Sequence, residues 1–195
     1  MRRLNDHYPT HTAVTQSLLT TYTAIGGAVL EPCAAAGQMA DVLRTHEGVT
    51  AVYTNDIDER FDTNWHEDAT DPLSPMWDIH PDWVITNPPF TLAPDILPNA
   101  LASCKVGVAF LLRLSYMEPA GDRGDWLQAH ADQQIMQAAL NPRPNFRAGE
   151  INPKNGKPYG TDNVTVAWFV WRKNWSWDRW GITLPFQFIT DWRKS

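Results

Sequence analysis

The chain has 195 residues, 43% of them hydrophobic, which is the size of one compact domain that can bury a core. No segment approaches the roughly 18 uninterrupted apolar residues of a membrane span, and the two N-terminal arginines precede no apolar run. We therefore expect a cytoplasmic protein without a membrane partner. The two cysteines, Cys33 and Cys104, and the six scattered histidines show no metal-ligand spacing, so we expect no bound metal.

The net charge of −6 is unevenly distributed along the chain. Residues 1–140 hold 7 Lys and Arg against 18 Asp and Glu, whereas residues 141–195 hold 9 against 4. Because local potential governs docking more than total charge does, an acidic body with a basic end is compatible with one face that contacts phosphates.

Short β-rich runs alternate with helical patterns, and this alternation predicts a parallel α/β sheet. The first unit is a strand over 28–32, "AVLEP", then the small-residue loop "CAAAG", then a helix from Gln38. The second strand, "TAVYTND", ends at Asp56, 19 positions after Gly37. At about this distance beyond the glycine loop of a dinucleotide-type unit, an acidic residue accepts hydrogen bonds from ribose hydroxyls.

The loop "EPCAAAG" offers one glycine where the dinucleotide fingerprint GxGxxG has three. Its alanines crowd the close backbone approach that a pyrophosphate needs. The loop therefore suits a ligand with a nucleoside and no phosphates, such as S-adenosylmethionine. An ordinary strand-to-helix turn of small residues explains the same letters, and the loop alone does not decide between the two.

A third strand, "DWVI", leads into the stretch "TNPPF". Proline cannot donate to a sheet ladder, so the strand stops and a rigid tip projects from the carboxyl end of the sheet. The Asn87 side-chain oxygen and the Pro88 carbonyl can each accept one N–H of a conjugated amino group, which favours a more tetrahedral, nucleophilic nitrogen. The prolines hold these acceptors in place beforehand. Phe90 supplies a stacking surface for a ring.

The order "EPCAAAG", "TNDID", "DWVITNPPF" resembles the class I S-adenosylmethionine-dependent methyltransferases, in particular the branch that includes DNA adenine-N6 methyltransferases. The resemblance implies a single Rossmann-like domain over residues 1–195, with a seven-stranded, mostly parallel sheet flanked by helices. It makes Asn87, Pro88, Pro89 and Phe90 the catalytic residues, because they match the family motif Asp/Asn-Pro-Pro-aromatic.

The same resemblance implies S-adenosyl-L-methionine as the cofactor, with Asp56 at the ribose hydroxyls and Asp68, in "HEDAT", at the adenine amino group. Ala35 stands where the family has its first glycine, which puts the affinity for the cofactor in question. Asp68 also reads as a capping or solvated turn residue. Cys33 is expected to be a small apolar neighbour of the cofactor and no nucleophile, since no cation is spaced to activate it. The implied cofactor contacts are Tyr8, Pro9, Thr10, Glu31, Pro32, Cys33, Ala35, Gly37, Asp56, Ile57, Asp68, Ala69 and Asn87.

Later segments, "AFLLRLSYMEP" and "NPRPNF…GTDNVTVAWFVW", resemble small phage and prophage methyltransferases of this type. The cofactor loop precedes the catalytic tip and the variable segment comes last, which is the gamma-class order. Five tryptophans between Trp168 and Trp180 fit either a buried core strand or a stacking platform for single strands. Trp83 is expected in the core.

A short insertion around 115–162 is expected to face the substrate. Its turn-rich end carries Arg143, Arg147, Lys154 and Lys157, which together with Phe90 are the expected substrate contacts. A solvated surface loop is the alternative. The shortness of the insertion predicts little base-specific readout.

The reaction predicted from these residues is transfer of a methyl group to the N6 amino group of adenine in nucleic acid, DNA before RNA. RNA adenine-N6 or guanine-N2 methylation and protein glutamine-N5 methylation remain open, because their acceptors are also conjugated amino groups. A catalytically silent nucleic-acid-binding protein of the same fold is the non-enzymatic alternative.

Overall fold

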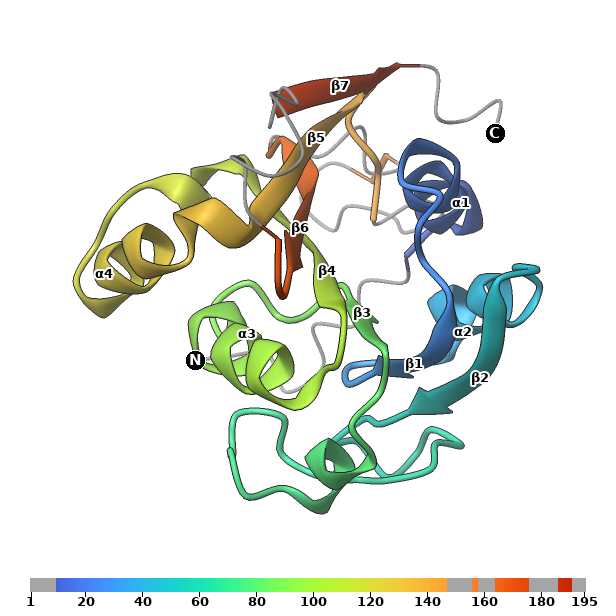
Figure 1. Ribbon diagram of the computed structural model, residues 1–195. Helices are drawn as coiled ribbons and strands as arrows, with labels where there is room; N and C mark the ends of the chain where they lie inside the picture. Colours follow the sequence, from blue (N-terminus) through green and yellow to red (C-terminus); the bar gives the residue numbers. More distant parts are fainter. Residues whose placement is uncertain (1–9, 147–155, 158–163, 176–185, 191–195) are drawn as a thin grey trace.

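The computed structural model describes residues 10–146, 156–157, 164–175 and 186–190, which form one seven-stranded sheet with helices on both faces (Figure 1). The strands are β1 (Gly27–Glu31), β2 (Val49–Thr54), β3 (Trp83–Thr86), β4 (Gly107–Arg113), β5 (Gln134–Asn141), β6 (Val166–Arg172) and β7 (Phe186–Thr190). Their spatial order is β2-β1-β3-β4-β6-β5-β7. β6 pairs antiparallel with both of its neighbours, and all other pairings are parallel. Six strands therefore run in one direction and β6 runs against them, so the expected mostly parallel, seven-stranded sheet is confirmed.

The central strands are near-continuous apolar runs because helices cover both faces of the sheet. β3 shows the alternation most simply. Trp83 and Ile85 point into one core cluster, while Val84 points into the other, and all three side chains are at most 1% exposed. The sequence of β3 therefore has no polar face to turn toward water.

Within the described residues, four α-helices flank the sheet: α1 (Thr12–Thr21), α2 (Gln38–Arg44), α3 (Ala93–Ser103) and α4 (Asp122–Ala129). Short 3₁₀ turns are η1 (Pro75–Ile79), η2 (Leu114–Met117) and η3 (Ala131–Gln133). Buried side chains of α1 and α2 share one core cluster, and those of α3 and η1 share the cluster on the opposite face. Figure 1 shows α1 and α2 on one side of the sheet and α3 on the other.

Helix α1 is fixed to the sheet by a long-range hydrogen bond. The indole N–H of Trp168, a fully buried residue of β6, donates to the Val14 carbonyl at 3.1 Å. This contact holds the start of α1, and with it Thr10, near the carboxyl end of the central strands. Trp83, Trp168 and Trp171 are all buried, which confirms the core interpretation for these three tryptophans.

Two features differ from the sequence reading. Helix α2 ends at Arg44, whereas the pattern "QMADVLRTHE" predicts a helix over 38–47. The N–H groups of Thr45 and His46 donate to the carbonyls three residues before them, which ends the helix. Within the predicted insertion, "QIMQAALN" forms β5, which lies between β6 and β7 and is mostly buried. In the part of the chain that the structure describes, no helix has the length and apolarity needed to cross a membrane. No cluster of three potential metal ligands is found there either.

Candidate active site

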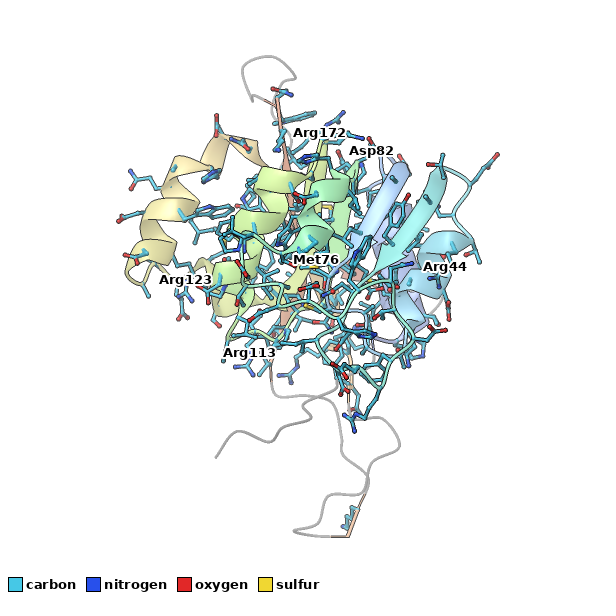
Figure 2. The ribbon with its side chains drawn as sticks, turned by 90° about the horizontal axis from the view of Figure 1, so that it is seen from below. Arg44, Met76, Asp82, Arg113, Arg123 and Arg172 are labelled. Atoms are coloured by element: carbon cyan, nitrogen blue, oxygen red, sulfur yellow. The ribbon has the colours of Figure 1, made fainter. Side chains whose placement is uncertain are left out.

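The predicted site residues gather where the parallel strands end. The loops that follow β1, β2 and β3, together with the last residue of β4, meet at the carboxyl edge of the sheet. Figure 2 shows Arg113, the last residue of β4, at this end of the strands, and Asp82, which precedes β3, at the opposite end. Ligands of open α/β sheets bind at the carboxyl edge.

The loop after β1 turns through two left-handed residues, Ala35 (φ 47°) and Gly37 (φ 82°). The strain at Ala35 is offset by a hydrogen bond, because its backbone N–H donates to Asp56 Oδ2 at 2.7 Å. A Cβ on Gly37 would meet no atom within 4 Å, so open space lies beside this part of the loop.

Asp56 is 8% exposed and holds two loops at once. Besides the Ala35 N–H on Oδ2, its Oδ1 accepts the backbone N–H of Asp58 at 3.0 Å. A carboxylate has about four lone-pair positions, so these two bonds leave acceptor capacity for ligand hydroxyls. Asp56 thus braces the loop and can also bind a ribose.

Glu31, the last residue of β1, is 3% exposed, and its Oε2 has no hydrogen-bond partner among the described residues. Burial raises the pKa of this carboxyl well above its ordinary value, against a smaller lowering by the Ala40 backbone N–H. A buried carboxyl with an unused oxygen suits a ligand that brings a cation or a donor group. S-adenosylmethionine has both, so the residues present fit this cofactor.

Five further predicted cofactor contacts belong to the loops after β1 and β2: Pro32, Cys33, Ile57, Asp68 and Ala69. Burial raises the pKa of the Cys33 thiol, and the carboxylates of Asp56, Glu31 and Asp68 act in the same direction. A thiol with a raised pKa is a poor nucleophile near neutral pH. Asp68 is exposed, and its Oδ1 accepts from the backbone N–H and the hydroxyl of Thr70 at 2.8 and 2.7 Å.

Asp68 therefore stabilises a local turn, as in the alternative reading, while lying near enough to Cys33 to influence its pKa. Ile57 follows Asp56 and is 68% exposed, which leaves an apolar surface free for a planar ring. Ala69 and Pro32, in the same two loops, are buried.

Asn55 is a residue of this site that the sequence reading missed. It is fully buried, and its Nδ2 donates to the carbonyls of Pro32 and Glu67, both at 3.0 Å, while its Oδ1 accepts the Glu67 N–H at 2.8 Å. Its backbone N–H donates to the Glu31 carbonyl at 2.9 Å. One side chain thus connects the loop after β1 with the loop that carries Asp68.

The amide of Asn87, in the tip that the sequence predicts to be catalytic, has a hydrogen-bond partner. Asn87 is half-buried, and its Nδ2 donates to the hydroxyl oxygen of Thr10 at 3.0 Å. Thr10 is only 7% exposed, so this contact is shielded from water. With the amide nitrogen directed at Thr10, Oδ1 points away from this partner and is available as an acceptor.

The carbonyl groups of the two prolines that follow Asn87 have different roles. The Pro89 carbonyl accepts the N–H groups of Leu92 and Ala93 at 2.8 and 3.1 Å, so it belongs to the start of α3. Among the described residues no donor reaches the Pro88 carbonyl. The two acceptors expected for an amino group, Asn87 Oδ1 and the Pro88 carbonyl, are both unengaged here.

Phe90 is half-buried and packs against both core clusters. The guanidinium carbon of Arg113 lies over its ring, 4.9 Å from the centroid. Arg113 is a second residue that the sequence reading missed. The sequence feature that could have identified Arg113 is its position directly after the apolar run "VAFLL", at the end of the strand beside β3.

The remaining predicted contacts are scattered. Thr10 is at the site, but its described bond is to Asn87. Arg143 and Lys157 are exposed. Tyr8, Pro9, Arg147 and Lys154 lie outside the described residues.

No protein-family model matches the chain, and no curated protein matches it in sequence. Solved structures do match. TrmN from Thermus thermophilus aligns with a TM-score of 0.53 and 22% identity over 83% of this chain and 48% of its own. A protein of Listeria monocytogenes assigned to the class I S-adenosylmethionine-dependent methyltransferases aligns with a TM-score of 0.56 and 11% identity, over 91% and 62% of the two chains.

A third match is the type I restriction-modification system methyltransferase subunit from Streptococcus thermophilus, with a TM-score of 0.56 and 12% identity over 93% of this chain and 46% of its own. The chain thus spans about half the length of two of these proteins and less than two thirds of the third. At these identities the likeness establishes the fold. The chain has the Rossmann-like fold of the class I S-adenosylmethionine-dependent methyltransferases.

Proposed function

We propose that the protein transfers a methyl group from S-adenosylmethionine to the N6 amino group of adenine in nucleic acid, with DNA preferred over RNA. The observation that carries the proposal is the tip Asn87-Pro88, where the hydrogen bond to Thr10 leaves the Asn87 oxygen and the Pro88 carbonyl as two unengaged acceptors. Two N–H donors on one planar nitrogen are the complement of such a pair.

The chemistry at the tip needs no strongly shifted general base. The two acceptors draw on the N–H bonds of the bound amino group and make its nitrogen lone pair available for attack. Attack would form the nitrogen–methyl bond as the methyl–sulfur bond breaks, with S-adenosylhomocysteine as the neutral leaving group. The nitrogen would then be cationic and acidic and would lose a proton to water. Because the prolines fix the acceptors before substrate arrives, little reorganisation is required when charge develops.

The cofactor would be held by the loops after β1 and β2. Glu31 offers its unused buried oxygen, Asp56 its remaining lone pairs and Ile57 an exposed apolar face. When bound, S-adenosylmethionine supplies an electrophilic methyl group on a sulfonium. The acidic surroundings of Cys33 suit a ligand that carries positive charge.

A nucleic-acid substrate is supported by the planar surface of Phe90 and the cation of Arg113 next to the acceptors. The type I restriction-modification methyltransferase subunit among the structural matches shares the fold. A target adenine inside a duplex would have to leave the stack, which costs a few kcal/mol and favours single-stranded or damaged sites. We further propose that residues 1–195 form a single domain. Its segment 115–162, apart from β5, would face the substrate and contribute little sequence specificity.

Nucleoside mass spectrometry tests the proposal. The protein is incubated with S-adenosylmethionine and with separate pools of mixed-sequence DNA and RNA, beside Asn87→Ala. N6-methyladenine in one pool, lost in the variant, is the expected result. Binding of S-adenosylhomocysteine to Asn87→Ala, measured by calorimetry, controls for folding. N2-methylguanine, or methylation of protein glutamine alone, would reassign the substrate. Cofactor binding without turnover on any of them would indicate the silent binding protein.

A further inference from the structure

Arg113 is a cation that lies beside the tip Asn87-Pro88-Pro89-Phe90. It ends β4, and β4 pairs with β3 in parallel register up to the pair Thr86 and Phe110, so Arg113 emerges beside the catalytic tip. Its guanidinium covers the ring of Phe90 at 4.9 Å. Since Phe90 packs against both core clusters, the surface beneath this exposed guanidinium is the part of the ring that a ligand can reach.

The charge of Arg113 has no carboxylate partner within the described residues. The nearest aromatic ring, that of Phe90, is thus the partner that the structure gives to this cation. An exposed guanidinium over an aromatic ring is held weakly, because water competes for the cation. Arg113 can therefore leave the ring when a better stacking partner and a better anion arrive together.

A nucleotide provides both partners at once. Its base is a planar surface for Phe90, and its phosphate is an anion that matches the planar fork of a guanidinium. We propose that Arg113 covers the stacking face of Phe90 in the free protein and, when a substrate base takes that face, binds the phosphate of the nucleotide. This inference rests on the proposed function for the class of substrate, and it assigns Arg113 as a substrate-binding residue.

A nearby arginine provides a matched control. Arg123, in α4, also lies over an aromatic ring, that of Tyr116, at 5.4 Å. Its Nη2 donates to the Glu118 carbonyl at 2.6 Å, so it is already engaged within its own segment. Figure 2 shows Arg113 and Arg123 toward the same side of the view. Loss of either cation changes the net charge equally, but only Arg113 lies over the catalytic tip.

The experiment measures the affinity of a labelled mixed-sequence 20-mer, as single-stranded DNA and as RNA, between 50 and 200 mM salt. Wild type is compared with Arg113→Gln, Arg113→Lys and Arg123→Gln. Arg113→Gln should bind about 10-fold more weakly at low salt, and the slope of log affinity against log salt should flatten by about 0.7, the value for one phosphate contact to a single strand. Arg113→Lys should keep the slope, and Arg123→Gln should stay within about twofold of wild type.

Equal slopes and affinities for wild type and Arg113→Gln would overturn the assignment, and so would an equal loss in Arg123→Gln, since that is a general charge effect. Absence of wild-type binding to both polymers would overturn it too. Nucleoside methylation by wild type is scored separately. If methylation occurs while Arg113→Gln binds normally, the proposed function stands and the phosphate contact is wrong. If binding follows the expected pattern without methylation, the enzymatic proposal fails instead.

Discussion

Replacing Asp56 should damage both the fold and the cofactor site, because its carboxylate accepts two backbone N–H groups from different loops. The bonds to Ala35 and Asp58 measure 2.7 and 3.0 Å. Each hydrogen bond to a charged acceptor contributes about 1.5 to 3 kcal/mol, and the buried charge itself costs part of that gain. Relaxation of the strained loop at Ala35 offsets a further share. We expect Asp56→Ala to lower the free energy of unfolding by about 2 to 4 kcal/mol.

The matched control is Asp58→Ala, which removes a neighbouring carboxylate but keeps the backbone N–H that Asp56 accepts. The Asp58 side chain pairs with the exposed Arg60, and such a surface pair contributes at most about 1 kcal/mol. Urea denaturation of both variants gives the difference in unfolding free energy. Calorimetry with S-adenosylhomocysteine then reports affinity for the cofactor product, which should fall in Asp56→Ala and persist in Asp58→Ala. Equal stability of the two variants would refute the bracing role of Asp56.

Three other substitutions test separate features of the site and the fold. Thr10→Val removes the partner of the Asn87 amide and should lower kcat about 5- to 10-fold with little change in KM, while Thr10→Ser should restore most of it, as steady-state kinetics would show. Because burial raises the folded-state pKa of Glu31 above 4.5, wild type loses stability as the pH rises through and beyond this value. Glu31→Gln should therefore gain stability relative to wild type between pH 4 and pH 8, and a pH-independent difference in urea midpoints would contradict this. Gly27→Ala should destabilise far more than Gly37→Ala in thermal unfolding. Both have positive φ, but only at Gly27 would the Cβ overlap a side chain, that of Asp82, whose carboxylate accepts the Ala28 N–H and is held in place by it.

The sequence carries local information about this site and little about its long-range contacts. The positions of "TNPPF" and Asp56 at the ends of strands could be predicted from the sequence, since each depends on residues within one βα unit. The hydrogen-bond partner of the Asn87 amide could not be predicted in this way. Thr10 lies 77 positions before Asn87 and is placed by the packing of α1 against β6. Arg113 was missed for the same reason, as its contact with Phe90 depends on the pairing of β4 with β3.

The strand β5 shows a different limit. "QIMQAALN" has little β-branched character and follows a helical stretch, so its local propensity does not favour a strand. It forms one because β6 offers an antiparallel edge and the core on both faces excludes water from its alanines. Tertiary contacts determine the secondary structure of this segment, whereas the apolar run of β4 is by itself typical of a buried strand.

The cross-bracing by Asn55 has a thermodynamic consequence for ligand binding. Its side chain uses both amide hydrogens and its oxygen inside the protein, so the loops after β1 and β2 are held together before any ligand arrives. No segment of these loops has to fold around the cofactor. Binding should therefore show a small negative heat-capacity change, set by the contact surface alone, without the larger value that accompanies coupled folding. In the proposed binding mode, by contrast, the guanidinium of Arg113 leaves the ring of Phe90 when a nucleotide binds, so that part of the site would rearrange.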